Sequence, residues 1–148
     1  MNEPGLKVQG LKVAHINVNG LFNKLHEIKI LLNAVKLDIL AISETRLHAD
    51  IKNEQIMVNG YQIARKDRLS ADNSWGSCLI YFADSLNGFE REDLKSNTNI
   101  ESTWIDVTLA SQKVLVGVAY RRPGDGEFCD RFKELLEPLC LSRTNILY

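Results

Sequence analysis

A strand–helix–strand pattern opens the chain and constrains its fold more than any other feature. Residues 11–18 alternate as a strand does and run into an Asn-Gly turn pair at 19–20. Apolar residues then recur at helical spacing over 22–35, with charged residues between them. The short apolar run 38–43 follows, as expected of a buried strand. This order, within about thirty residues, predicts a βαβ-like unit.

Later segments change character and predict antiparallel hairpins. Short runs rich in β-branched and aromatic residues alternate with polar turns. The predicted strands are 61–64, 78–82, 104–109 and 114–120, and the predicted turns are 70–74, 87–88 and 111–112. A second amphipathic helix extends from Phe128 to Leu139, where Pro138 should introduce a kink or an early end. Residues 145–148 have the composition of a further strand.

Together these elements predict an α+β protein of one domain. The length of 148 residues suits a single domain, which can bury about 70% of its unfolded surface. We expect a flexible N-terminus at 1–10 and one folded domain at 11–148. The longest apolar run is far too short for a membrane span, and the N-terminus has no secretory-signal pattern. We therefore expect an intracellular protein, nuclear or cytoplasmic, that is not secreted.

The charge balance restricts how the chain could bind nucleic acid. Lys plus Arg number 18 and Asp plus Glu number 19, which gives a net charge of −1. Binding by bulk charge would need a strongly basic protein, so phosphate binding must depend on local arginine clusters or on a metal ion. The three cysteines are widely spaced without a C-x-x-C pair, which argues against a zinc site or a disulfide framework.

Polar residues stand at the ends of the two strands of the βαβ-like unit. Asn17 closes the first strand and Glu44 follows the second. A carboxylate there is costly to bury unless it is paired or bound to a cation. If the strands are parallel neighbours, both residues emerge at one sheet edge, where Mg²⁺ could bind with phosphate and water. The alternative is that Glu44 pairs with Arg46 and that Asn17 only forms a turn.

Two further strand ends carry groups that suit phosphate. Tyr120, Arg121 and Arg122 end one apolar strand, and the Arg-Lys-Asp-Arg stretch 65–68 follows another. Guanidinium groups match phosphate geometry. The alternative for each cluster is ordinary solvated surface charge.

Three ordered motifs resemble those of the endonuclease/exonuclease/phosphatase superfamily. They are Ile16-Asn17-Val18-Asn19-Gly20-Leu21, Ile42-Ser43-Glu44-Thr45-Arg46-Leu47 and Val118-Ala119-Tyr120-Arg121-Arg122-Pro123. With 65–68 and 79–82, they look most like the apurinic-endonuclease-like domain of non-long-terminal-repeat retrotransposons. The resemblance covers about 11–148. It implies the N-terminal portion of a four-layer α/β/β/α sandwich, with mixed, mostly antiparallel sheets and flanking helices.

The resemblance also implies a chemistry and assigns roles to residues. It implies metal-dependent hydrolysis of phosphoester bonds with Mg²⁺ or Mn²⁺, DNA as the partner (RNA or another phosphoester being possible), and a downstream reverse transcriptase in the parent protein. Glu44 matches the metal-binding glutamate, Asn17 the active-site asparagine, and Tyr120 the tyrosine near the scissile phosphate. A general base would activate water for in-line attack. The residues expected to bind phosphate or nucleic acid are Asn19, Arg65, Arg68 and Arg121.

The sequence departs from the family pattern in its later motifs. It contains neither the Asp-x-Asn motif nor the Asp-His pair, and residues 145–148 resemble the strand that leads into the former. None of the three histidines matches the general base, whose removal commonly costs ~10²–10⁴ in rate. We therefore expect a domain truncated on its C-terminal side, with little or no nicking activity from these 148 residues alone.

Two alternatives remain open at this level. The chain could be a non-catalytic relic, in which a missing second sheet would leave apolar surface exposed and favour aggregation. It could also be an enzyme of the same superfamily that acts on another phosphoester, since a fold alone does not choose the substrate.

Overall fold

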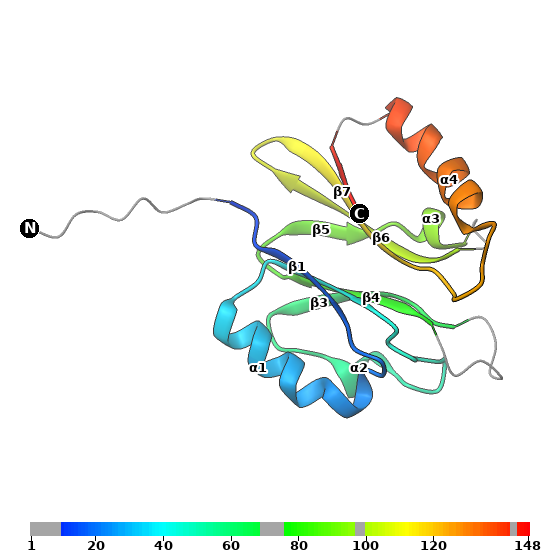
Figure 1. Cartoon of the computed structure of the whole chain (residues 1–148). Coiled ribbons are helices and arrows are strands. Elements are labelled where there is room, and N and C mark those ends of the chain that lie inside the picture. Colours follow the sequence, from blue (N-terminus) through cyan, green and yellow to red (C-terminus); the bar gives the residue numbers. More distant parts are fainter. Residues whose placement is uncertain (1–9, 69–75, 97–99, 143–144) are drawn as a thin grey trace, which may run out of the picture.

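Two four-stranded sheets stack face to face in the computed structural model, which describes residues 10–68, 76–96, 100–142 and 145–148 (Figure 1). The first sheet has the order β1-β2-β4-β3, and the second has the order β5-β6-β7-β8. The strands are β1 (Val13–Asn17), β2 (Ile39–Ser43), β3 (Tyr61–Lys66), β4 (Cys78–Ala83), β5 (Asn87–Glu90), β6 (Glu101–Leu109), β7 (Gln112–Tyr120) and β8 (Ile146–Leu147). β1–β2 and β7–β8 are parallel pairs and the others are antiparallel. The flexible N-terminus predicted at 1–10 lies outside the described residues except for Gly10.

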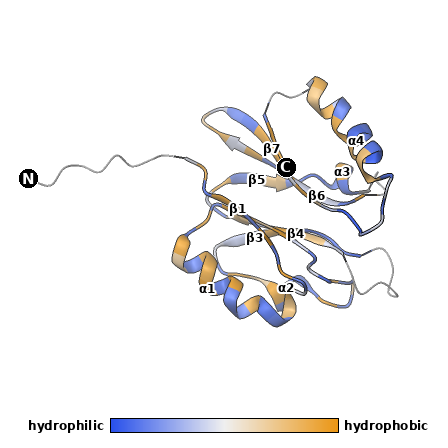
Figure 2. Ribbon diagram, viewed as in Figure 1, coloured by the Kyte–Doolittle hydropathy of each residue, from blue (hydrophilic) through white to orange (hydrophobic). Residues whose placement is uncertain are grey.

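Helices cover the outer face of each sheet. They are the short 3₁₀ turn η1 (Phe22–Lys24), α1 (Leu25–Val35), α2 (Asn53–Ile56), α3 (Glu92–Ser96) and α4 (Phe128–Ser142). α1 and α2 lie over the first sheet, and α3 and α4 lie over the second. Both α1 and α4 carry one hydrophobic and one hydrophilic side (Figure 2). The predicted βαβ-like opening and the α/β/β/α layering are both confirmed.

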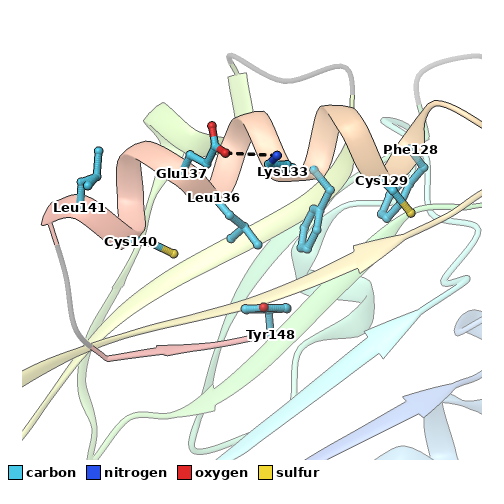
Figure 3. A pocket seen from close by; sticks show the side chains of 9 residues that line it. Phe128, Cys129, Lys133, Leu136, Glu137, Cys140, Leu141 and Tyr148 are labelled. Atoms are coloured by element: carbon cyan, nitrogen blue, oxygen red, sulfur yellow. Dashed lines mark ion pairs between the residues drawn. The ribbon is translucent and has the colours of Figure 1, made fainter.

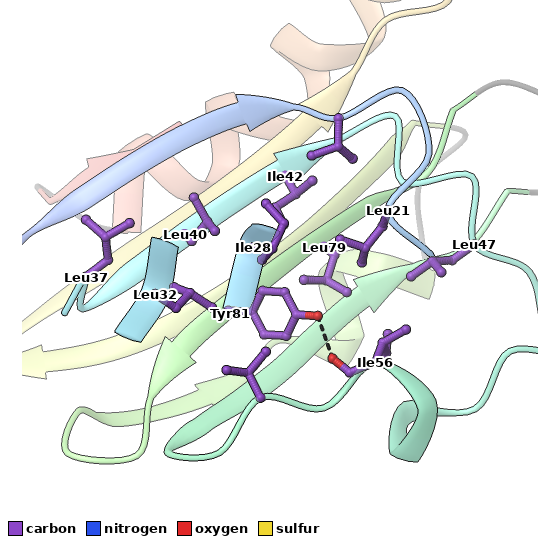
Figure 4. Close-up of a cluster of buried hydrophobic side chains, with 12 residues drawn as sticks. Leu21, Ile28, Leu32, Leu37, Leu40, Ile42, Leu47, Ile56, Leu79 and Tyr81 are labelled. Carbon is purple, nitrogen blue, oxygen red and sulfur yellow. Dashed lines mark hydrogen bonds between the residues drawn. The ribbon is translucent and has the colours of Figure 1, made fainter. Parts of the chain in front are cut away.

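Each of the three interfaces between layers has its own apolar cluster. Under α1 and α2, residues from both helices meet one face of β2 and β4, and the Tyr81 hydroxyl donates to the Ile56 carbonyl oxygen at 2.6 Å (Figure 4). Alternate residues of the same strands, including Ile39 and Ile80, point to the other side and pack against β6 and β7. Burial on both faces explains why these strands are apolar throughout.

The cluster under α4 is built around Trp104. Its indole is fully buried, donates to the Ser102 hydroxyl at 3.0 Å and stacks on Phe132 of α4. A Cβ atom at Gly117, on the neighbouring strand β7, would overlap the indole ring. The glycine is therefore required by the close approach of the ring to the backbone.

Three expectations about elements prove wrong. The early end predicted at Pro138 is wrong, because this exposed proline lies inside α4, which continues to Ser142; the alternative of a kink stays a prediction. Asn87 and Gly88 do not form a turn but begin β5, because the chain reverses at residues 84–86 instead. The second sheet is present, so the relic alternative loses its premise that a whole sheet is missing. The turn predicted at 70–74 lies outside the described residues.

An apolar groove of about 660 Å³ lies between α4 and Tyr148, which follows β8 (Figure 3). Phe128 and Phe132 stack on each other, and Tyr148 meets Phe132 edge to face. Leu141 is 91% exposed at its end. Within the part of the chain that the structure describes, no helix is long and apolar enough to cross a membrane.

Candidate active site

The ends of β1 and β2 form one edge, which we call the rim. Asn17 pairs in register with Ser43, and Glu44 is the next residue along the chain. The loops that follow the two strands are joined through their backbones, since the amide of Gly20 donates to the Glu44 carbonyl oxygen at 2.8 Å. The expectation that Asn17 and Glu44 emerge at one edge is confirmed, while their catalytic roles stay predictions.

A third loop, at 76–77, is hydrogen-bonded to the backbone that follows β2 at the rim. The amide of Thr45 donates to the Ser77 carbonyl oxygen at 3.3 Å, and that of Arg46 donates to the Gly76 carbonyl oxygen at 3.1 Å. The hydroxyls of Thr45 and Ser77 lie 2.5 Å apart and both side chains are buried. Three separate segments of sequence therefore hold the backbone around Glu44 in place.

Strained backbone is concentrated at the rim. Asn19, Glu44 and Arg46 have φ values of 48°, 55° and 57°, in the left-handed region that non-glycine residues rarely adopt. Such conformations cost about 1–3 kcal/mol each and cluster at functional sites. The side-chain oxygen of Asn17 accepts the amide of Asn19 at 3.2 Å, and the Asn19 side chain accepts the Arg46 guanidinium.

Arg46 contacts Asn19, which bears on the alternative that Glu44 is paired with Arg46. No ion pair joins Glu44 to Arg46 within the described residues, and no described group donates a hydrogen bond to the Glu44 carboxylate. Asn17 does form a turn, as that alternative required. The half-buried Glu44 carboxylate is therefore available to a cation.

Tyr120 reaches the rim from the second sheet. It is the last residue of β7, only 7% exposed, and its hydroxyl has no hydrogen-bond partner among the described residues. Burial raises the pKa of Tyr120, and the carboxylates of Glu44 and Glu101 raise it further, against a smaller lowering by Arg122. The electrostatic influence of Glu44 on this phenol brings Asn17, Glu44 and Tyr120 into one neighbourhood.

Glu101 is a component of the site that the sequence did not reveal. Its carboxylate is 4% exposed, accepts the amide of Ser77 at 2.9 Å and accepts the guanidinium of Arg122 through Nε and Nη2. Through these partners, Glu101 connects the loop before β4 of the first sheet to the end of β7 in the second sheet. Glu101 is also the register partner of Tyr120. The available signal was an acidic residue at the start of a strand that is otherwise buried.

The predicted nucleic-acid-binding residues fall into two groups. Asn19 lies at the rim, and Arg121 is exposed next to Tyr120, with its Nε donating to the Asp125 carbonyl oxygen at 3.2 Å. Arg68 is half-buried, and its amide donates to the Leu47 carbonyl oxygen.

Arg65 is different, because its guanidinium is engaged within the protein. Its nitrogens donate to the carboxylate of Asp67, to the carbonyl oxygens of Ile51 and His48, and to the Asn53 side chain. These bonds use every donor that the guanidinium has. A phosphate contact would have to break them, so Arg65 is not available to bind a phosphate as the structure stands.

The histidines show no arrangement suited to a general base at the rim. His15 Nε2 lies 3.1 Å from the Ser43 hydroxyl on exposed β1, His26 is exposed on α1, and His48 Nδ1 lies 3.5 Å from Asp50. That none of the three matches the general base stays a prediction.

The oxygen donors at the rim fit a hard cation better than a soft one. Among the described residues no three His, Cys, Asp or Glu side chains gather as a complete metal cage. Mg²⁺ and Mn²⁺ commonly use one or two carboxylates, with substrate phosphate and water completing the shell. The unpaired Glu44 carboxylate and the neighbouring Asn17 amide satisfy that pattern.

No protein-family model matches the sequence, and no curated protein matches it either. Solved structures do match. The endonuclease domain of TRAS1, a telomere-specific non-LTR retrotransposon, has a TM-score of 0.59 at 14% identity, over 86% of this chain and 52% of that chain. The AP endonuclease LMAP from Leishmania major gives 0.62 at 19% identity, over 88% and 46%. The 3′ phosphatase NExo from Neisseria, solved with a product DNA hairpin, gives 0.61 at 15% identity, over 93% and 55%.

These similarities show that the chain has the fold of the endonuclease/exonuclease/phosphatase superfamily, as the sequence motifs indicated. The chain spans about half the length of the solved structures that it matches.

Proposed function

We propose that this chain is part of a metal-dependent hydrolase that cleaves phosphoester bonds in nucleic acid. The carrying observation is that the Glu44 carboxylate at the rim acts electrostatically on Tyr120, a buried phenol with no hydrogen-bond partner among the described residues. The fold is shared with nucleases and a DNA 3′ phosphatase, which supports this chemistry over other uses of such a pair.

Each residue of the rim would have its own role in binding the metal ion and the phosphate. Glu44 would hold Mg²⁺, with Asn17 nearby to orient the scissile phosphate. The cation would neutralise negative charge on the transferring phosphate and on the leaving oxygen. The raised pKa of Tyr120 keeps its hydroxyl protonated at neutral pH, so it would donate to a phosphate oxygen. Arg121 is exposed next to Tyr120 and would contact a phosphate of the bound nucleic acid.

We further propose that the activity of the parent protein is DNA nicking of the retrotransposon type. The likeness to the TRAS1 endonuclease domain supports this version, together with the three ordered motifs. A general base and further ligands would come from Asp-x-Asn and Asp-His motifs that these 148 residues do not contain. Plasmid nicking by this chain alone should therefore stay near background.

The test is the effect of Mg²⁺ on the binding of a short fluorescent DNA duplex at fixed ionic strength, read by anisotropy. A cation shared between Glu44 and phosphate should tighten binding when Mg²⁺ replaces monovalent salt. Ordinary counterion competition would weaken it. Glu44→Gln should lose the tightening, and Glu54→Gln, a matched change on exposed α2, should keep it. Weakening by Mg²⁺ in the unmodified chain, or tightening that Glu44→Gln retains, would contradict the proposal.

A further inference from the structure

A small polar cavity lies beside the rim, between the end of β7 and the first turns of α4. Its volume is about 120 Å³, and the residues that define it are Glu101, Tyr120, Arg122, Asp125, Phe128 and Arg131. At about 30 Å³ for each water in the liquid, this is room for roughly four waters. A phosphate group fits a space of that size.

The cavity is bordered by hydrogen-bond donors without acceptors. Within the described residues, the hydroxyl of Tyr120 and the Nε of Arg131 are buried and have no partner. Arg122 uses Nε and Nη2 on Glu101, and its remaining terminal nitrogen has no described acceptor. A buried polar group left unpaired costs about 1–3 kcal/mol. Several such groups around one cavity indicate that it receives an acceptor.

The acidic residues of the cavity are already paired. Glu101 accepts from Arg122 and from the amide of Ser77. Asp125 accepts Nη2 of Arg131 at 2.5 Å and the amide of Glu127 at 3.2 Å. The two carboxylates balance the two guanidinium groups in charge, and the groups left over are donors. These donors suit a compact group with several acceptor oxygens.

We propose that this cavity binds a phosphate group of a nucleic acid strand, adjacent to the phosphate that Glu44 would hold. Tyr120 lies between the two places, since it lines the cavity and is influenced by the Glu44 carboxylate; its hydroxyl has one proton and would donate to one of the two phosphates at a time. Arg131, on α4, would donate through Nε while Asp125 fixes its guanidinium. This inference rests on the proposed function, because it takes the phosphate from the same strand.

The first experiment uses inorganic phosphate as the probe, without metal and in the presence of a chelator. Calorimetry measures affinity, and the NMR resonance of the Arg131 Nε–H group reports binding at the cavity itself. Arg131→Lys keeps the positive charge but removes that N–H, and should weaken binding about tenfold. Tyr120→Phe should weaken it similarly. Lys133→Arg, an exposed change two residues along α4, should leave affinity unchanged.

Equal phosphate affinity in Arg131→Lys and Lys133→Arg, or an unshifted Arg131 Nε–H resonance at saturating phosphate, would overturn the inference and leave the cavity to water. A second arm compares a dinucleoside monophosphate, which has only an internal diester, with a 3′-phosphorylated nucleotide. Binding of either that depends on Arg131 supports the inference, and the tighter one identifies the phosphate as internal or terminal. The Mg²⁺-dependent DNA binding of Glu44→Gln is a separate measurement, and the phosphate experiment is done without metal. Failure of the proposed function can therefore be distinguished from failure of this inference.

Discussion

At the scale of single residues, the chemistry of the rim depends on how Glu44 and Tyr120 influence each other. The phenol is buried, and burial is the largest cause of its raised pKa, followed by the Glu44 carboxylate. A phenol that stays protonated keeps its O–H available to donate to an acceptor that enters the site. The carboxylate has no described partner to neutralise it, so a cation would bind there and would also relieve its effect on Tyr120.

This coupling predicts the titration of Tyr120. Its pKa should lie above the ordinary tyrosine value of about 10, as followed by NMR of the phenol carbon. Glu44→Gln should lower that pKa, because it removes a nearby negative charge, whereas Glu54→Gln should leave it unchanged. A Tyr120 that titrates no higher than ordinary tyrosine would contradict its burial, and one whose pKa does not respond to Glu44→Gln would show that the two side chains are not neighbours.

A site residue could be predicted from the sequence only where the local sequence determines its position. Asn17 and Glu44 end apolar strands, so their place at the rim follows from strand direction. The environment of Arg65 depends on partners from α2 and the loop before it, which no local pattern announces. Glu101 was missed for the same reason, since its partners Ser77 and Arg122 come from two other segments.

At the scale of elements, one glycine of β7 allows the Trp104 ring of β6 to lie directly against the β7 backbone, under α4. Gly117 lies under the indole of Trp104, which itself stacks on Phe132. The close contact allows the second sheet to bury the largest side chain of its outer face. β7 ends at Tyr120, so this packing also supports the backbone that carries the phenol to the rim.

The contact predicts a large effect of a single methyl group. Gly117→Ala should lower the free energy of unfolding by about 1–3 kcal/mol or more, because the new Cβ displaces a buried ring. Gly126→Ala is the matched control, since nothing lies within 4 Å of its Cβ position. Urea unfolding measures both. Equal stability of the two variants would contradict the packing described here.

Element types were predictable where one periodicity dominated, and boundaries were not. The amphipathic repeats predicted α1 and α4, while the end of α4 was misplaced, because an exposed proline near a helix end removes only one backbone bond and the helix continues past Pro138. Asn87-Gly88 has the composition of a turn, but pairing with β6 determines its extended conformation. Tertiary pairing of that kind overrides local preference.

At the scale of the whole molecule, two sheets share one buried layer between them. That layer contains Cys78 and Tyr120, while Tyr81 lies in the layer under α1. The first sheet provides the rim and the second sheet provides Tyr120, so the site cannot form unless the two sheets pack together. The layered arrangement followed from the motifs, whereas the pairing between sheets could not be predicted because it depends on contacts distant in sequence.

Burial of these three groups predicts a loss of stability at alkaline pH. Burial raises the pKa of Cys78, Tyr81 and Tyr120 in the folded state. Above the unfolded values, about 8.5 for Cys and about 10 for Tyr, the unfolded chain loses protons that the folded chain keeps, so the free energy of unfolding falls as pH rises. Urea unfolding from pH 7 to about 10.5 should show this decline. Cys78→Ala should flatten its first part, and a constant free energy in the unmodified chain would contradict the burial.

The most direct measurement of the central claim is the position of a bound metal ion. Low concentrations of Mn²⁺ should selectively broaden the backbone amide resonances of Asn17, Thr45 and Ser77, because the ion would lie at Glu44. Glu44→Gln should abolish this broadening and Glu54→Gln should preserve it. Broadening centred elsewhere, or unchanged at the rim in Glu44→Gln, would contradict a metal-dependent site at these strand ends.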